Sequence, residues 1–257
     1  MLSSYHTHIA ESGLDNMVMA AAAHRMPVLG ISERMDRLGR PEQLEQYRAQ
    51  VRFAAAPGLR LRMGVELDFL PDAVHAMETL LTREQWDFAL GGVHQVAGTP
   101  LHRLAFGDLG QSWGVWRAYC EAQARAVRSG LLDVLAHPLR LARHLAPPPY
   151  LEQLLLPLLE AAREMGVAME IHGGDWGQRT VLHGRLITWA HASGVRVCLG
   201  AGAHRPQDVA QHLPDVAAAL HRAGYLSVTG FVGRRAVAEA LPQSPSRFGR
   251  NWATGMR

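Results

Sequence analysis

Five separate strand-like segments of this sequence end in histidine or glutamate, side chains that commonly bind transition metals. The first carries His6 and His8, alternate residues that a strand points to the same side. The later segments end in Glu66, His94, His137 and His204. Barrels of parallel strands build their sites from the carboxyl ends of several strands. The repeated placement therefore predicts a metal site at one end of an α/β barrel.

Short apolar runs alternate with longer amphipathic stretches along the whole chain. The runs predict strands at Leu2–Thr7, Val28–Ser32, Leu59–Phe69, Phe88–His94, Leu132–Ala136, Val167–Ile171 and Val195–Leu199. The clearest stretches predict helices at Asp15–His24, Trp113–Ser129, Tyr150–Glu164, Leu182–Ala192 and Gln207–Arg222. This order favours one closed or nearly closed barrel of parallel strands. A doubly wound nucleotide-binding sheet is disfavoured, because the first turn lacks a glycine-rich phosphate loop.

Composition excludes several classes of function. The chain has 257 residues, 48% of them hydrophobic, which is enough for a substantial core. Its 26 basic residues are all arginine and are nearly balanced by 23 acids, so no nucleic-acid partner is expected. Two cysteines are too few for a disulfide framework, and the sequence shows no membrane-spanning or targeting segment. We expect a cytoplasmic protein, and the composition leaves its oligomeric state open.

The candidate segments occur in an order that resembles a known family. They read His-x-His, Gly-Val-Glu-Leu-Asp-Phe-Leu-Pro, Gly-Gly-Val-His, Ala-His-Pro and Leu-Gly-Ala-Gly-Ala-His-Arg-Pro. This series resembles the histidinol-phosphatase branch of the PHP (polymerase and histidinol phosphatase) superfamily, from residue 1 to about residue 235. The resemblance implies a distorted (β/α)7, TIM-like barrel of PHP type over residues 1–241. Residues 242–257 are expected to form a loosely packed or disordered tail.

The same resemblance implies a cluster of up to three metal ions that hydrolyses phosphomonoesters. His6 and His8 resemble the ligands of one ion. Glu66 resembles a bridge to a second ion, for which His94 and His137 resemble the other ligands. His204 resembles a ligand of the third ion.

Three ligands of the family pattern are replaced in this chain. Leu14, Arg34 and Gly202 stand where the pattern has histidine, histidine and aspartate, and none of the three can bind a metal through its side chain. The set of Glu66, His94 and His137 is complete. We therefore expect one or two divalent transition-metal ions, of Zn, Mn or Fe, in place of three.

Other residues near these positions have two readings. The guanidinium of Arg34 is suited to a substrate phosphate, or it turns outward and pairs with Asp36 or Glu33. Glu33, His172 and Asp175 are either substitute metal ligands or local hydrogen-bonding groups. The remaining histidines are assigned to surface or packing roles: His24, His75, His102, His144, His183, His191, His212 and His221.

These observations predict a metal-dependent phosphoesterase with a reduced metal site, acting on a small phosphorylated metabolite. A catalytically decayed barrel that serves as a binding or regulatory module is the main alternative. A metal-dependent hydrolase of carboxyl esters or amides is a third.

Overall fold

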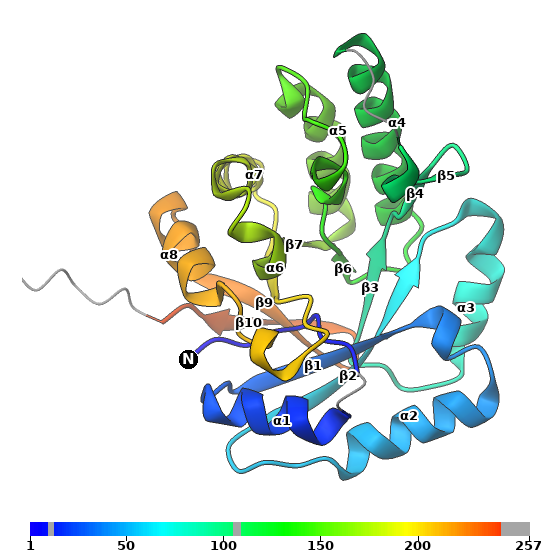
Figure 1. Ribbon diagram of the computed structural model, residues 1–257, viewed down its shortest axis with the longest axis vertical. Helices are drawn as coiled ribbons and strands as arrows, with labels where there is room; N and C mark the ends of the chain where they lie inside the picture. Colours follow the sequence, from blue (N-terminus) through cyan, green and yellow to red (C-terminus); the bar gives the residue numbers. More distant parts are fainter. Residues whose placement is uncertain (10–12, 105–108, 243–257) are drawn as a thin grey trace, which may run out of the picture.

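The computed structural model describes residues 1–9, 13–104 and 109–242, and within this part of the chain a six-stranded parallel sheet forms the centre. Its order is β1-β2-β3-β6-β7-β8, with helices packed around the outside (Figure 1). The strands are β1 Val28–Arg34, β2 Arg60–Asp68, β3 Phe88–Gly92, β6 Val134–Leu135, β7 Ala168–His172 and β8 Val197–Gly200. The prediction of a single α/β domain built on parallel strands is confirmed.

The N-terminal residues close this sheet into a barrel. The segment predicted as the first strand makes parallel bridges from Ser4 to Leu29 in β1 and from Thr7 to Ala203 after β8. Backbone hydrogen bonds join the segment to both edge strands, including Gly30 N–H to Ser4 O at 2.7 Å. His6 and His8 therefore lie between the first and last strands of the sheet.

Eight helices occur in the described part of the chain. They are α1 Leu14–Ala23, α2 Pro41–Phe53, α3 Val74–Thr82, α4 Leu109–Arg128, α5 Leu151–Met165, α6 Gly173–Trp176, α7 Thr180–Ala192 and α8 Leu213–Ala223. Short 3-10 turns lie at Met35–Arg37, Pro71–Ala73, Leu101–Arg103, Arg140–Arg143 and Pro206–Asp208. None of the described helices is both long and apolar enough to span a bilayer.

The sequence patterns missed some of these elements. The stretch predicted as one helix from residue 207 is split, because α8 begins only at Leu213 and carries Pro214 in its first turn, where no N–H donor is needed. Helix α2 was missed because it is polar and buries only Leu44, Tyr47 and Val51. Residues 243–257, nearly all of the expected tail, lie outside the described residues.

An aromatic cluster fills the barrel at the amino ends of the strands. Phe88, the first residue of β3, packs edge-on against Tyr5 with ring centroids 5.3 Å apart. Gly30 and Gly64 make room for its ring, since a Cβ at either position would overlap it. The hairpin of β9 Ser227–Val232 and β10 Arg235–Ala240 covers this end, with Phe231 packed on Tyr5. The open end of the barrel is therefore the carboxyl end of the strands.

Two further strands form a small hairpin beside the open end. These are β4 Gln95–Val96 and β5 Thr99–Pro100, which pair antiparallel directly after His94. This hairpin links the end of β3 to the loop of residues 101–104 that borders the site.

Candidate metal centre

Four imidazoles converge on the carboxylate of Glu66 at the open end of the barrel. Glu66 lies in β2, and its oxygens are 3.8 Å from His6 Nε2, 3.5 Å from His8 Nε2, 3.7 Å from His94 Nε2 and 3.2 Å from His137 Nε2. Glu66, His6, His8 and His137 are all buried, and His94 is partly buried. The structure thus brings together five of the six metal ligands predicted from the sequence.

The spacing of these nitrogens fits a bound divalent ion. His6 Nε2 lies 3.1 Å from His8 Nε2, and His94 Nε2 lies 3.3 Å from His137 Nε2. Two nitrogens bound to one tetrahedral zinc ion at 2.0–2.1 Å are separated by about 3.3 Å. We name Glu66, His94 and His137 the β3–β6 side of the centre. We name His6, His8 and His204 its N-terminal side, which shares Glu66.

Two carboxylates orient the imidazoles from behind. Asp68 accepts a hydrogen bond from Nδ1 of His94 at 3.0 Å, and Glu170 accepts one from Nδ1 of His6 at 2.8 Å. Each bond keeps the proton on Nδ1 and leaves Nε2 free for an ion. The sequence analysis did not assign either carboxylate a role. Both lie two residues from a candidate ligand on the same strand, which is the signal that could have found them.

Glu170 also forms a hydrogen bond with the backbone of His137, on the β3–β6 side. Its second oxygen accepts a hydrogen bond from the backbone N–H of His137 at 2.5 Å. His137 has a φ of 31°, in the left-handed region that a residue with a side chain rarely adopts. This buried carboxylate therefore links His6 of the N-terminal side to a strained backbone position on the β3–β6 side.

The electrostatics keep the centre ready for a cation. Burial opposes ionisation of Glu66, but His6, His8 and His94 outweigh it and lower the pKa of this carboxyl. Burial, with neighbouring His6, lowers the pKa of His8 to about 2. Burial, with neighbouring Arg140, lowers the pKa of His137 well below the usual value. The ionised carboxylate of Glu66 beside the neutral imidazoles of His8 and His137 is a donor set that zinc and similar ions prefer.

The sixth predicted ligand lies at the edge of the cluster. His204 is exposed and stacks on the ring of His8, with centroids 4.4 Å apart and an angle of 14°. Leu14, which replaces a ligand of the family pattern, is buried in the hydrophobic core. On the N-terminal side, therefore, His6 and His8 face Glu66 and His204 does not extend the buried cluster.

The residues proposed as substitute ligands are held by other groups. Glu33 is buried and accepts hydrogen bonds from the backbone N–H groups of Ile9 and Arg34 at 3.1 Å each, while its carboxylate lies 3.9 Å from His8 Nδ1. Asp175 is buried and forms an ion pair with Arg143.

His172 lies inside the cluster. Its ring is buried, 5.5 Å from that of His6 and 5.9 Å from that of His137 between centroids. Among the described residues, ligand atoms of His6, Glu170 and His172 lie within 4.8 Å of one another, as do those of His6, Glu66 and His137.

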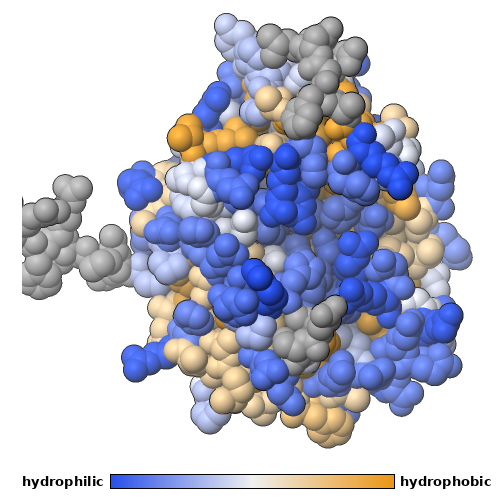
Figure 2. Space-filling view, in the orientation of Figure 1, coloured by the Kyte–Doolittle hydropathy of each residue, from blue (hydrophilic) through white to orange (hydrophobic). Residues whose placement is uncertain are grey.

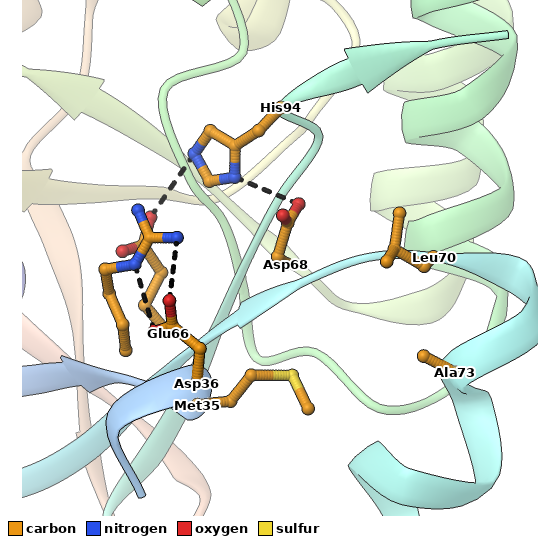
Figure 3. A pocket seen from close by; sticks show the side chains of 8 residues that line it. Met35, Asp36, Glu66, Asp68, Leu70, Ala73 and His94 are labelled. Atoms are coloured by element: carbon orange, nitrogen blue, oxygen red, sulfur yellow. Dashed lines mark hydrogen bonds and ion pairs between the residues drawn. The ribbon is translucent and has the colours of Figure 1, made fainter. Parts of the chain in front are cut away.

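Arg34 stands at the mouth of the centre. Its guanidinium pairs with Asp36 at 3.2 Å and also lines a cavity of about 220 Å³ that reaches Glu66 and His94 (Figure 3). The apolar part of this cavity is formed by Met35, Leu70 and Ala73. The structure therefore shows the ion pair with Asp36 of the outward-facing reading, and contact with a substrate phosphate stays a prediction.

A second cavity, of about 390 Å³, adjoins the first. Arg34, Asp68 and His94 line both cavities, and Arg140, His102 and His144 are added in the second. The sequence analysis had assigned His102 and His144 to surface or packing roles, because a pattern cannot show which loops border a site. The middle of the face shown in Figure 2 is hydrophilic, as expected of a site for charged ligands.

Comparisons with known proteins identify a family and a similar fold. Over 204 residues the chain is 28% identical to a probable histidinol-phosphatase of Deinococcus radiodurans, which covers 73% of this chain and 75% of that protein. The fold of the present chain is similar to that in the crystal structure of histidinol phosphate phosphatase from Lactococcus lactis, complexed with zinc, L-histidinol and phosphate. That match has a TM-score of 0.72 and 15% identity, and covers 92% of this chain and 98% of the other. Residues 1–173 match the PHP domain, and the chain belongs to the PHP family.

Proposed function

We propose that this protein is a metal-dependent phosphomonoesterase that resembles histidinol-phosphatase. One observation carries the proposal: two pairs of imidazole nitrogens lie around the buried carboxylate of Glu66. Within each pair, the separation of the nitrogens is that of two ligands on one tetrahedral ion. The relatives that carry histidinol-phosphatase names support it, and one of them was crystallised with zinc and phosphate.

The centre is proposed to hold one or two divalent ions of Zn, Mn or Fe. The β3–β6 side would hold the tighter ion, because its three ligands are all present and Asp68 orients His94. His6, His8 and Glu66 would hold a second ion more weakly. When bound, such ions make hydroxide from water near neutral pH and neutralise charge on a phosphoryl group.

The side chains around the cavities suit a phosphate ester. The guanidinium of Arg34 is proposed to contact the phosphate, with Arg140 on the wall of the adjoining cavity. The apolar wall of Met35, Leu70 and Ala73 would receive the organic part of the ester. The proposed substrate is a small phosphorylated metabolite, because the two cavities measure only about 220 and 390 Å³.

The test is an assay of purified protein with its metal content measured. Turnover of L-histidinol phosphate and p-nitrophenyl phosphate is compared with that of carboxyl esters and amides, before and after chelation and with Zn, Mn or Fe restored. We expect turnover of the phosphomonoesters that disappears on chelation and returns with metal.

Two results would contradict the proposal. Bound metal without turnover of any phosphomonoester would identify a decayed barrel that acts as a binding or regulatory module. Turnover confined to carboxyl esters or amides would identify a different hydrolase.

A further inference from the structure

The loop after β8 and the end of β7 are packed together through two glycines. A Cβ on Gly200 would overlap the carboxylate of Glu170, and a Cβ on Gly202 would overlap Nε2 of His172. In both cases a side chain of β7 fills the space that a side chain at the end of β8 or just after it would need. His172 therefore occupies the direction in which a ligand at position 202 would project.

The hydrogen bonds of His172 fix which ring nitrogen carries the proton. The backbone N–H of Asp175 points at Nδ1 of His172, with a separation of 3.1 Å. A backbone N–H can only donate, so Nδ1 is the acceptor and has no proton. The proton of the neutral ring is then on Nε2, and that nitrogen has no lone pair available for a metal ion. This arrangement differs from that of His6, whose Nδ1 faces a carboxylate.

We propose that His172 is a fixed hydrogen-bond donor to the phosphate group and is not a substitute metal ligand. This inference rests on the proposed phosphatase function and deepens it. Its ring is as buried as those of His6 and His137, at 2%, 2% and 1% exposure, so it belongs to the same shielded cluster. A neutral donor at this place attracts an anion that is already held by cations, without competing for the metal.

The decisive comparison uses zinc-loaded protein and inorganic phosphate as the probe. His172→Leu removes the donor, and His172→Gln keeps an N–H group at nearly the same place as Nε2. We expect the zinc content per chain to be unchanged in both variants. Phosphate affinity, measured by titration calorimetry, should fall about tenfold or more in His172→Leu, as for a lost hydrogen bond to a charged group. His172→Gln should retain most of the affinity.

A direct measurement of the tautomer is made on the wild-type protein and needs a variant only to assign the signal. Nitrogen-15 spectra of the imidazoles in zinc-loaded wild-type protein should include the signal of a neutral ring protonated on Nε2 that is missing from His172→Gln. A His172 signal typical of a metal-bound nitrogen, or loss of one zinc ion in His172→Leu, would overturn the inference.

The glycine at position 202 offers an independent check with a matched control. Gly202 and Gly98 have φ values of 62° and 76°, so alanine strains the backbone at both positions. Only at position 202 would the new Cβ meet His172, whereas nothing lies within 4 Å of a Cβ at position 98. Gly202→Ala should therefore weaken phosphate binding, while Gly98→Ala should leave it unchanged. Equal phosphate binding in the two variants would contradict the role of His172.

These outcomes separate the inference from the function on which it rests. Wild-type protein that binds zinc and hydrolyses phosphomonoesters, with phosphate binding unaffected in His172→Leu, would remove only the role of His172. Wild-type protein that binds none of Zn, Mn and Fe would remove the proposed function and this inference together.

Discussion

The two sides of the metal centre share Glu66 but differ in how they are built. On the β3–β6 side, His94 and His137 meet the carboxylate at 3.7 and 3.2 Å, and Asp68 orients His94. On the N-terminal side, His6 and His8 converge in the same way, but His204 only stacks on the face of His8. The comparison shows that the imidazoles on one side of a shared carboxylate can all face it while an imidazole on the other side only borders the cluster.

Three positions on or near the N-terminal side differ from the ligands that the resemblance to the family implies. Leu14 is part of the hydrophobic core, Arg34 places a guanidinium at the cavity mouth, and Gly202 leaves space for His172. We propose that none of the three positions supplies a metal ligand and that two of them bring another polar group toward the centre. The predictions below are designed to test this contrast.

The largest effect is expected from Glu66→Gln. An amide is a weaker metal ligand than a carboxylate, and this residue is shared by both sides of the centre. We expect the variant to retain less than half of the wild-type metal after dialysis, measured by elemental analysis with the fold confirmed by circular dichroism. His204→Gln is the comparison, because this exposed ring is at the edge, and its metal content should match that of the wild type. Equal losses in both variants would show that the two sides are not distinguished by Glu66.

A smaller effect should separate the two ions. When a chelator is added to the wild type, metal should be released in a fast step and a slow step. The slow step should be the release of the β3–β6 ion, because all its proposed ligands are present. His137→Asn should abolish the slow step and preserve the fast one, and His8→Asn should abolish the fast step and preserve the slow one. Three ions that all resist dialysis would contradict this order and would require ligands beyond the two sides, with Glu33 and Asp175 the first to examine.

The metal-free protein should lose stability in mild acid. Burial is the main cause that lowers the pKa of His8, His137 and His172 from 6.5, so below this pH the unfolded chain binds more protons at these residues than the folded chain does. His6 acts in the opposite sense, because the effect of Glu170 outweighs burial and raises its pKa.

The three lowered groups outnumber the raised one, so stability should fall as the pH falls through 6.5. Each net proton contributes about 1.4 kcal/mol per pH unit. Thermal unfolding of the chelated protein should therefore occur several degrees lower at pH 5.5 than at pH 7.5. A midpoint that rises on acidification would show that these histidines are not held neutral.

The smallest effect is expected from Arg34→Ala. Loss of its contact with a phosphate should weaken the binding of inorganic phosphate by about 1.5 to 3 kcal/mol, with unchanged metal content. Asp36, its partner, has a side chain that is 64% exposed, so water replaces the lost ion pair at little cost. Arg37→Ala is the matched control, because Arg37 pairs with Glu33 at 3.5 Å and its side chain is 63% exposed. Equal phosphate affinity in all three proteins would remove Arg34 from the site.

Much of the fold could be predicted from the sequence. Six of the seven expected apolar runs form the strands of the parallel sheet, because burial on both faces requires continuous apolar residues. The candidate ligands could be found because they are polar residues at the points where these apolar runs stop. The hairpin of β9 and β10 was not predicted, since β10 is mostly exposed and lacks a buried apolar run.

The sequence by itself determined which side chains stand at the carboxyl ends of the strands, because the alternation along a strand is a local property. Only the tertiary structure decided how they meet. Glu170 reaches His6 across 164 residues of chain, and His172 fits beside Gly202 because β7 and β8 pair in one register. Register and packing depend on segments far apart in the chain, so no local pattern contains them.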